Sequence, residues 1–171
     1  IKGPDLLILA FSLIQKEFES LQLVLAGPDD GLKPNLMQIV KDMHLMKQVH
    51  FIGYVGGEDK SRAYHAAELL VIPSRQEAMS IVVLEAGMCG TPVVLTDRCG
   101  FDAVAEVDGG KVVPATVEGL RHGIRSTLTN SANTDLYGAN LKQVVEKNFV
   151  WDVIIRRYVE LYNKVMPGKT A

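Results

Sequence analysis

Short, continuously apolar runs alternate along this chain with longer segments whose apolar residues recur at helical spacing, and this alternation constrains the fold most. The apolar runs predict strands, and they lie at 21–26, 49–52, 69–73, 92–96 and 111–113. Apolar residues fill these runs instead of alternating with polar ones, which is typical of parallel strands covered by helices on both faces. We therefore expect a parallel sheet that is buried on both sides.

Amphipathic helices are expected between and after these strands. In the first helix, Leu6, Ala10, Ile14 and Phe18 recur every four residues and form one apolar face. Strands and helices taken in turn predict an α/β fold with a doubly wound parallel sheet. We expect one domain over residues 1–166 and a tail at 167–171. The remaining helices are expected at 34–43, 59–67, 81–89, 117–128, 135–147 and 151–165.

Composition and charge narrow the possible functions. The chain has 171 residues, 47% of them hydrophobic, and a net charge of -2, so it lacks the basic field that attracts nucleic acid. Neither Cys89 nor Cys99 has a second cysteine or a histidine at ligand spacing, so we expect no metal site and a reducing, cytoplasmic environment. No apolar run approaches the roughly 18–20 residues of a membrane span, and membrane association is expected only through parts outside this sequence.

The loop and helix that follow the run at 69–73 are the candidate site. In a parallel sheet, ligands bind where strands end and helices begin. The amides of Met79, Ser80 and Ile81 would point out of the helix start and suit a phosphate group. Glu77 precedes them, and Glu85 offers two acceptor oxygens to the vicinal hydroxyls of a ribose. Spacing alone also fits a plain helix cap and a solvated side chain, and it favours that simpler interpretation.

Residues 77–94 resemble the signature of the group 1, or family 4, glycosyltransferases. In that signature a Glu, seven residues and a Glu-Ala pair lead into a Cys-Gly-x-Pro-Val-Val turn. The likeness extends over nearly the whole chain. Further matches are Lys2-Gly3 with Asp5, Ala26-Gly27-Pro28, Val49-x-Phe51-x-Gly53, and Phe149-x-Trp151.

The resemblance implies the two-domain GT-B architecture, of which this chain is the C-terminal, donor-binding, Rossmann-like domain. The first strand of that domain is expected before Ile1 and is missing from the sequence. The implied activity is transfer of a sugar, with retention at the anomeric carbon, from a UDP- or GDP-linked donor. The acceptor, whose identity is unknown, is expected on an N-terminal domain of the same polypeptide, so the fragment alone is expected to be inactive. No cofactor is implied, because the nucleotide-sugar is a substrate.

The family assigns roles that carry over to matching residues here. Glu77 takes the catalytic position beside the transferred sugar, Glu85 binds the ribose hydroxyls, and Lys2 neutralises the donor diphosphate. The common Gly-Phe-Gly of the family reads Ala78-Met79-Ser80 in this chain, which leaves the identity of the sugar open. The loop after 49–52 is expected to offer backbone groups to the base. Together with Glu85 and Lys2, the expected donor-binding residues are Gly27, Tyr54, Val55, Met79, Ser80 and Ile81.

Two rival functions remain open at this point. A GT-B-related nucleotide-sugar epimerase would share the sheet and change the chemistry, and a scaffold module would keep the fold without turnover. Dehydrogenases and nucleoside triphosphatases lose their main support, because neither a Gly-x-Gly-x-x-Gly turn nor a phosphate-binding loop occurs. The histidines are scattered singly along the chain, and none is spaced from a carboxylate or cysteine as metal ligands are. They are His44, His50, His65 and His122.

Overall fold

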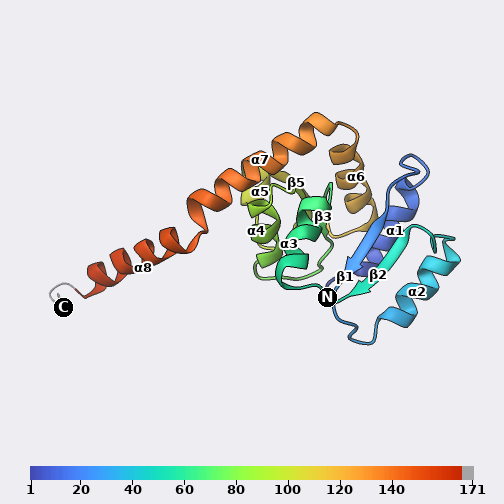
Figure 1. The fold of residues 1–171 in the computed structure, drawn as a ribbon, viewed down its shortest axis with the longest axis horizontal. Coiled ribbons are helices and arrows are strands. Elements are labelled where there is room, and N and C mark those ends of the chain that lie inside the picture. Colours follow the sequence, from blue (N-terminus) through green and yellow to red (C-terminus); the bar gives the residue numbers. More distant parts are fainter. Residues whose placement is uncertain (167–171) are drawn as a thin grey trace.

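A computed structural model of the chain describes residues 1–166, and the expected tail at 167–171 lies outside the described residues. The described part is an α/β domain with one long helix extending from it (Figure 1). The strands are β1 (Leu23–Ala26), β2 (Val49–Gly53), β3 (Leu70–Ile72), β4 (Val93–Thr96) and β5 (Gly110–Val113). The helices are α1 (Pro4–Ile14), α2 (Lys33–Asp42), α3 (Gly57–Ala66), α4 (Ile81–Met88), α5 (Ala103–Glu106), α6 (Val117–Leu128), α7 (Ser131–Asn148) and α8 (Trp151–Val165).

All strand pairs are parallel, which confirms the expected doubly wound fold. β1 pairs with β2, while β3, β4 and β5 form a second sheet in that order. Within residues 1–166, β1 and β3 do not pair with each other. The first element is α1 and no strand precedes it, so the expected absence of a first strand is also confirmed.

One apolar core lies under both sheets. Helices α1, α2 and α6 pack together on this face, and Ile8, Ile14 and Leu120 on them are fully buried. Val94 of β4 and, less completely buried, Leu25 of β1 point into the same cluster. A single layer of helices therefore holds the two sheets side by side.

A second core covers the opposite face of β3, β4 and β5. Val93 and Leu95 of β4 point into it, because successive residues of a strand face opposite sides. Helices α4 and α7 close this face and approach each other tightly at Gly87, where any side chain would overlap Leu141 and Val145. The expectation of strands covered on both faces is confirmed for β4, whose four residues are all buried.

The same expectation is wrong for β1 and β2. Their second face is open, and Val24 of β1 and Ile52 of β2 are about half exposed. The physical reason is that α3, the helix after β2, packs against α4 and not against this face. Continuous apolarity in the sequence thus does not distinguish a strand covered on one side from a strand covered on both.

Helix α8 has the bounds that its apolar stripe predicts. It extends away from the rest of the molecule (Figure 1), and none of its residues is buried. Trp151, Tyr158 and Tyr162 remain more than half exposed. Within residues 1–166, this stripe has no apolar surface to pack on, in contrast to the stripes of α1 and α6. The short helix α5 was not expected from the sequence, since four residues carry no periodic pattern.

We predict that Leu141→Ala lowers the free energy of unfolding by about 2–5 kcal/mol, because it leaves a cavity between α7 and α4. The matched change Leu136→Ala, on the exposed side of the same helix, should cost less than about 0.5 kcal/mol. Urea-induced unfolding of the two variants measures both values. Equal losses would contradict the assignment of this core.

Candidate functional site

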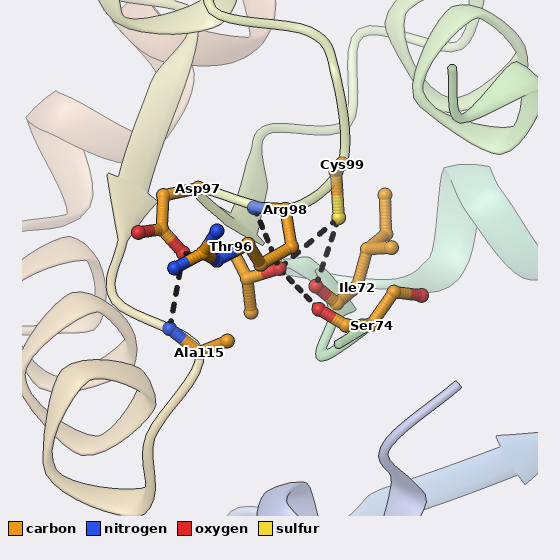
Figure 2. A network of polar contacts seen from close by, with 7 residues as sticks. All are labelled: Ile72, Ser74, Thr96, Asp97, Arg98, Cys99 and Ala115. Carbon is orange, nitrogen blue, oxygen red and sulfur yellow. Dashed lines mark hydrogen bonds and ion pairs between the residues drawn. The ribbon is translucent and has the colours of Figure 1, made fainter. Parts of the chain in front are cut away.

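The loop that joins β3 to α4 is clamped to the loop that follows β4 (Figure 2). The buried Thr96 hydroxyl donates a hydrogen bond to the Ser74 carbonyl and lies 3.3 Å from Cys99 Sγ. Cys99 Sγ in turn lies 3.7 Å from the Ile72 carbonyl oxygen, and the Arg98 amide lies 3.4 Å from Thr96 Oγ1. One buried hydroxyl at the end of β4 therefore fixes where the β3 loop begins.

Further backbone contacts hold Glu77 in place. The Glu77 amide donates to the Arg98 carbonyl over 2.8 Å. Gly100 has a left-handed backbone (φ +59°) and packs so closely on the Ala78 carbonyl that a side chain would collide with it. Asp97 connects the same loop to the residues after β5, since its carboxylate accepts the Ala115 amide at 3.2 Å. The position of Glu77 is thus set by three neighbouring strand ends.

The side chain of Glu77 contacts Lys2. Its Oε1 lies 3.2 Å from Lys2 Nζ, and its Oε2 accepts the Ser74 hydroxyl at 2.9 Å. The Glu77 side chain is only 16% exposed, whereas that of Lys2 is 72% exposed. Lys2 is therefore free to move toward solvent while Glu77 stays fixed.

The start of the chain is anchored beside this loop by Arg75. Its guanidinium makes two hydrogen bonds to the Asp5 carboxylate, of 2.9 and 2.6 Å, and its amide donates to the Ile1 carbonyl at 2.7 Å. The hydrogen bond from Arg75 lowers the pKa of Asp5, against the opposing effect of partial burial. These contacts keep Lys2, which lies between Ile1 and Asp5, next to Glu77.

The start of α4 presents backbone donors that no acceptor satisfies. Among the hydrogen bonds of residues 1–166, none is donated by the amides of Met79, Ser80 or Ile81. Ser80 is the N-cap residue, yet its side chain accepts no amide, and its buried hydroxyl has no partner within the same part of the chain. Met79 and Ile81 are 40% and 67% exposed. Unpaired donors and the positive end of the helix dipole make this a place for an anion.

Glu85 lies one turn into α4 and belongs to a separate cluster. Its carboxylate contacts Lys60 Nζ at 2.6 and 2.8 Å and accepts the Tyr64 hydroxyl at 2.8 Å. Burial of Tyr64, and then its hydrogen bond to Glu85, raise the pKa of the phenol well above its ordinary value. No hydrogen bond or ion pair of residues 1–166 joins Glu77 to Glu85 directly.

The remaining expected residues follow the other sheet. Gly27 ends β1, and its amide donates to the Gly53 carbonyl at the end of β2 over 2.8 Å. Tyr54 is 79% exposed, and its ring lies against Gly56, while Val55 is half-buried. Within residues 1–166 no hydrogen bond connects these three residues with the clusters around Glu77 and Glu85.

Two hollows in the surface are lined by neither Glu77 nor Glu85. One, of about 370 Å³, is lined by residues near the beginning of β4, among them Glu68, Cys89 and Asp135. The other, of about 400 Å³, lies between α2 and β2. Among residues 1–166, no three histidine, cysteine or acidic side chains cluster at metal-binding distance, and no helix has the length and apolarity to cross a membrane.

Sequence reasoning missed the partners of the two glutamates. Ser74 adjoins the signature and was not assigned a role. Lys60 and Tyr64 are four residues apart on α3, a spacing that places two side chains on the same helix face, and this was the available signal. What the sequence does not contain is the packing of α3 against α4, which directs that face at Glu85.

Known proteins resemble this chain over most of its length. A family model described as glycosyl transferases, group 1, matches residues 1–144. An uncharacterized glycosyltransferase of Methanocaldococcus jannaschii is 31% identical over 167 residues, which are 96% of this chain and 42% of that protein. The structure of sucrose-phosphate synthase from Thermosynechococcus elongatus is similar with a TM-score of 0.84 and 27% identity, and the match covers 96% of this chain and 42% of that chain.

A third similarity concerns the fold alone. The structure of HepE from Anabaena in complex with UDP and glucose matches with a TM-score of 0.83 at 22% identity. The match covers 95% of this chain and 45% of that one. This chain therefore spans less than half the length of each of the three proteins.

We predict that Thr96→Val, which replaces the buried hydroxyl by a methyl group of similar size, lowers the free energy of unfolding by about 1–3 kcal/mol. The control is Thr129→Val, which removes an exposed hydroxyl that bonds only within its own helix turn, and it should cost less than about 0.5 kcal/mol. Guanidinium unfolding curves of both variants check the difference. A Thr96→Val variant as stable as the unchanged protein would show that the clamp is not energetically important.

Proposed function

Because the chain belongs to the group 1 glycosyl transferases, we propose that it is the donor-binding domain of a retaining glycosyltransferase and binds a nucleotide-diphosphate sugar. The donor diphosphate would lie at the start of α4, the transferred sugar beside Glu77 and the ribose at Glu85. The acceptor would be held by an N-terminal domain of the same polypeptide, and the base would contact Tyr54 and Val55. The two cysteines are free and support a cytoplasmic location.

One observation carries this proposal, namely the unpaired donors at the start of α4. An amide without an acceptor is costly unless a ligand or water completes its hydrogen bond. Here the amides of Met79, Ser80 and Ile81 follow one another at the positive end of a helix. The Lys2 ammonium is exposed and pairs with Glu77, and it adds a mobile positive charge near this point. A diphosphate bound here would accept from the exposed amides of Met79 and Ile81 and from the Lys2 ammonium.

The same arrangement suits transfer of the sugar. When the bond to the anomeric carbon breaks, negative charge grows on the leaving diphosphate, and preorganised donors stabilise that charge most. Glu77 is fixed by Ser74 and by its own backbone, so its carboxylate can orient the sugar without reorganisation. When a phosphate attracts Lys2, the Glu77 carboxylate gains a free oxygen for a sugar hydroxyl.

A UDP-linked or GDP-linked donor is the form that we propose. The Anabaena protein of the same fold was crystallised with UDP and glucose, which supports a uridine nucleotide as the first choice. Tyr54, which follows β2, is 79% exposed and is therefore accessible to either base.

Nucleotide binding and turnover without an acceptor separate the rival functions. A scaffold module would bind none of the nucleotides UDP, GDP and ADP, and calorimetric titration of the full-length protein tests that directly. An epimerase would bind the nucleotide-sugar and convert it without any acceptor. The family membership of the chain favours transfer over both.

We predict that Ser80→Ala weakens UDP or GDP binding about tenfold if the helix start opens on binding and the Ser80 hydroxyl, which is buried and has no protein partner in the unliganded chain, bonds to the diphosphate. The stability of the unliganded protein should stay unchanged or rise, since an unsatisfied group is removed. Ser20→Ala, at an exposed serine, serves as the control. Isothermal titration and thermal unfolding together measure both effects, and a destabilised variant with unaltered affinity would contradict this role.

We predict that Glu77→Gln lowers kcat of the full-length enzyme by about 100-fold or more, with little change in KM for the donor, if the carboxylate acts chiefly in the transition state. The amide keeps the shape of the side chain and an oxygen for Ser74. Glu118→Gln, at an exposed carboxylate of α6, is the control and should leave kcat unchanged. Transfer measured with radiolabelled donor decides the matter, and full turnover by the Glu77 variant would remove this residue from catalysis.

A further inference from the structure

Tyr64 and Lys60 converge on Glu85 from the neighbouring helix. Both lie on α3, one turn apart, and α3 packs against α4, which carries Glu85. The Tyr64 hydroxyl donates to Glu85 Oε2 at 2.8 Å, while Lys60 Nζ bridges both oxygens at 2.8 and 2.6 Å. The proposed function uses Glu85 and leaves these two contacts unexplained.

We propose, resting on the proposed function, that Tyr64 is a positioning residue that orients the Glu85 carboxylate for the ribose diol, and that Lys60 is the contact that yields when the diol binds. These two side chains would determine how strongly the domain prefers a nucleotide that carries a ribose diol. Neither the signature nor the family match assigns a role to Tyr64 or Lys60.

The acceptor sites of the carboxylate support this division. A carboxylate offers about four lone-pair sites, two on each oxygen. In the structure Oε2 accepts the Tyr64 hydroxyl and Oε1 accepts Lys60 Nζ, while the Lys60 ammonium also lies 2.6 Å from Oε2 as an ion-pair contact. One acceptor site therefore remains on each oxygen, but the ammonium covers the one on Oε2. A pair of vicinal hydroxyls that binds side by side needs one free site on each oxygen.

Release of a single contact on Oε2 creates that arrangement. If Lys60 keeps only its bond to Oε1, each oxygen holds one protein donor and has one site left, which matches two neighbouring hydroxyls. Lys60 can make this move because its side chain is 36% exposed and flexible. Tyr64 cannot, since it is buried with only 9% of its surface exposed and its backbone carbonyl is held by the Thr91 hydroxyl at 2.7 Å.

The chemistry of Tyr64 suits a fixed donor. Its raised pKa, caused first by burial and then by Glu85, keeps the phenol protonated at every physiological pH, so it always donates to Oε2. This bond fixes the rotation of the carboxylate about its last side-chain torsion, which is otherwise soft. Without it, Lys60 alone determines the orientation and is free to cover both oxygens.

The test compares two ligands that differ only in the diol. UDP and 2′,3′-dideoxy-UDP are titrated calorimetrically into the full-length protein and its variants, with GDP and its dideoxy analogue as a parallel pair. The unchanged protein should prefer the ribose form. In Tyr64→Phe, affinity for the ribose form should fall about tenfold, as expected for a lost hydrogen bond to a charged group, while affinity for the dideoxy form stays within about twofold.

Lys60→Met gives the second arm, because it keeps the length of the side chain and removes the competing donor. Preference for the ribose form should be retained or should increase in this variant. Tyr158→Phe, at an exposed tyrosine of α8, is the matched control and should behave like the unchanged protein. Thermal unfolding of each unliganded variant detects a merely structural bridge between α3 and α4, which would alter stability and leave the preference alone.

The outcomes separate the two levels of the proposal. Ribose preference in the unchanged protein that survives in Tyr64→Phe would overturn the role of Tyr64 and leave the proposed function intact. A loss of preference in Lys60→Met as large as in Tyr64→Phe would overturn the role of Lys60. Failure of the unchanged protein to bind either nucleotide would overturn the proposed function and this inference with it.

Discussion

Strand β4 is the part of the molecule on which the rest depends. It is buried on both faces, with Val93 and Leu95 in one core and Val94 in the other, so it joins the two layers of helices. Its last residue, Thr96, turns its hydroxyl toward the loop after β3 and fixes the Ser74 carbonyl. The same strand therefore holds the hydrophobic cores together and sets the position of the polar site at its end.

Each carboxylate of the polar site has one fixed partner and one mobile partner. Glu77 lies in the clamped loop and is nearly buried, whereas its partner Lys2 is exposed. Glu85 repeats the pattern, with a buried tyrosine that stays in place and a partly exposed lysine that can move. In both clusters a fixed group holds the carboxylate and a flexible cation balances its charge. Such a site is preorganised for a ligand and keeps its mobile parts at the surface.

Much of this could be predicted from the sequence. The apolar periodicity located α6 and α8 at their observed bounds, and the apolar runs located all five strands to within a few residues. The signature assigned Glu77, Lys2 and the start of α4 to one expected donor site, and the structure brings Glu77 within 3.2 Å of Lys2. Apolar periodicity indicates which residues are buried, and a short motif indicates a local turn. Both signals come from residues close together in the sequence, so a single sequence is enough to detect them.

The rest depended on packing between distant segments. Nothing near Lys60 or Tyr64 in the sequence indicates that α3 lies against α4. Because we expected helices on both faces of every strand, the exposure of Val24 and Ile52 was not predicted. The sequence also could not show that the Ser80 hydroxyl lacks a hydrogen-bond partner, because a serine before a helix ordinarily caps that helix. Contacts of this kind arise from tertiary structure and are decided by shapes that the pattern of residues does not encode.

The proposed function requires that the start of α4 binds the diphosphate of a nucleotide-sugar. A crystal structure of the full-length protein with its nucleotide bound would show where the diphosphate lies. We expect diphosphate oxygens at hydrogen-bond distance, roughly 2.7–3.2 Å, from the amides of Met79 to Ile81, with the ribose at Glu85. A diphosphate bound elsewhere, with those amides still unpaired, would contradict it.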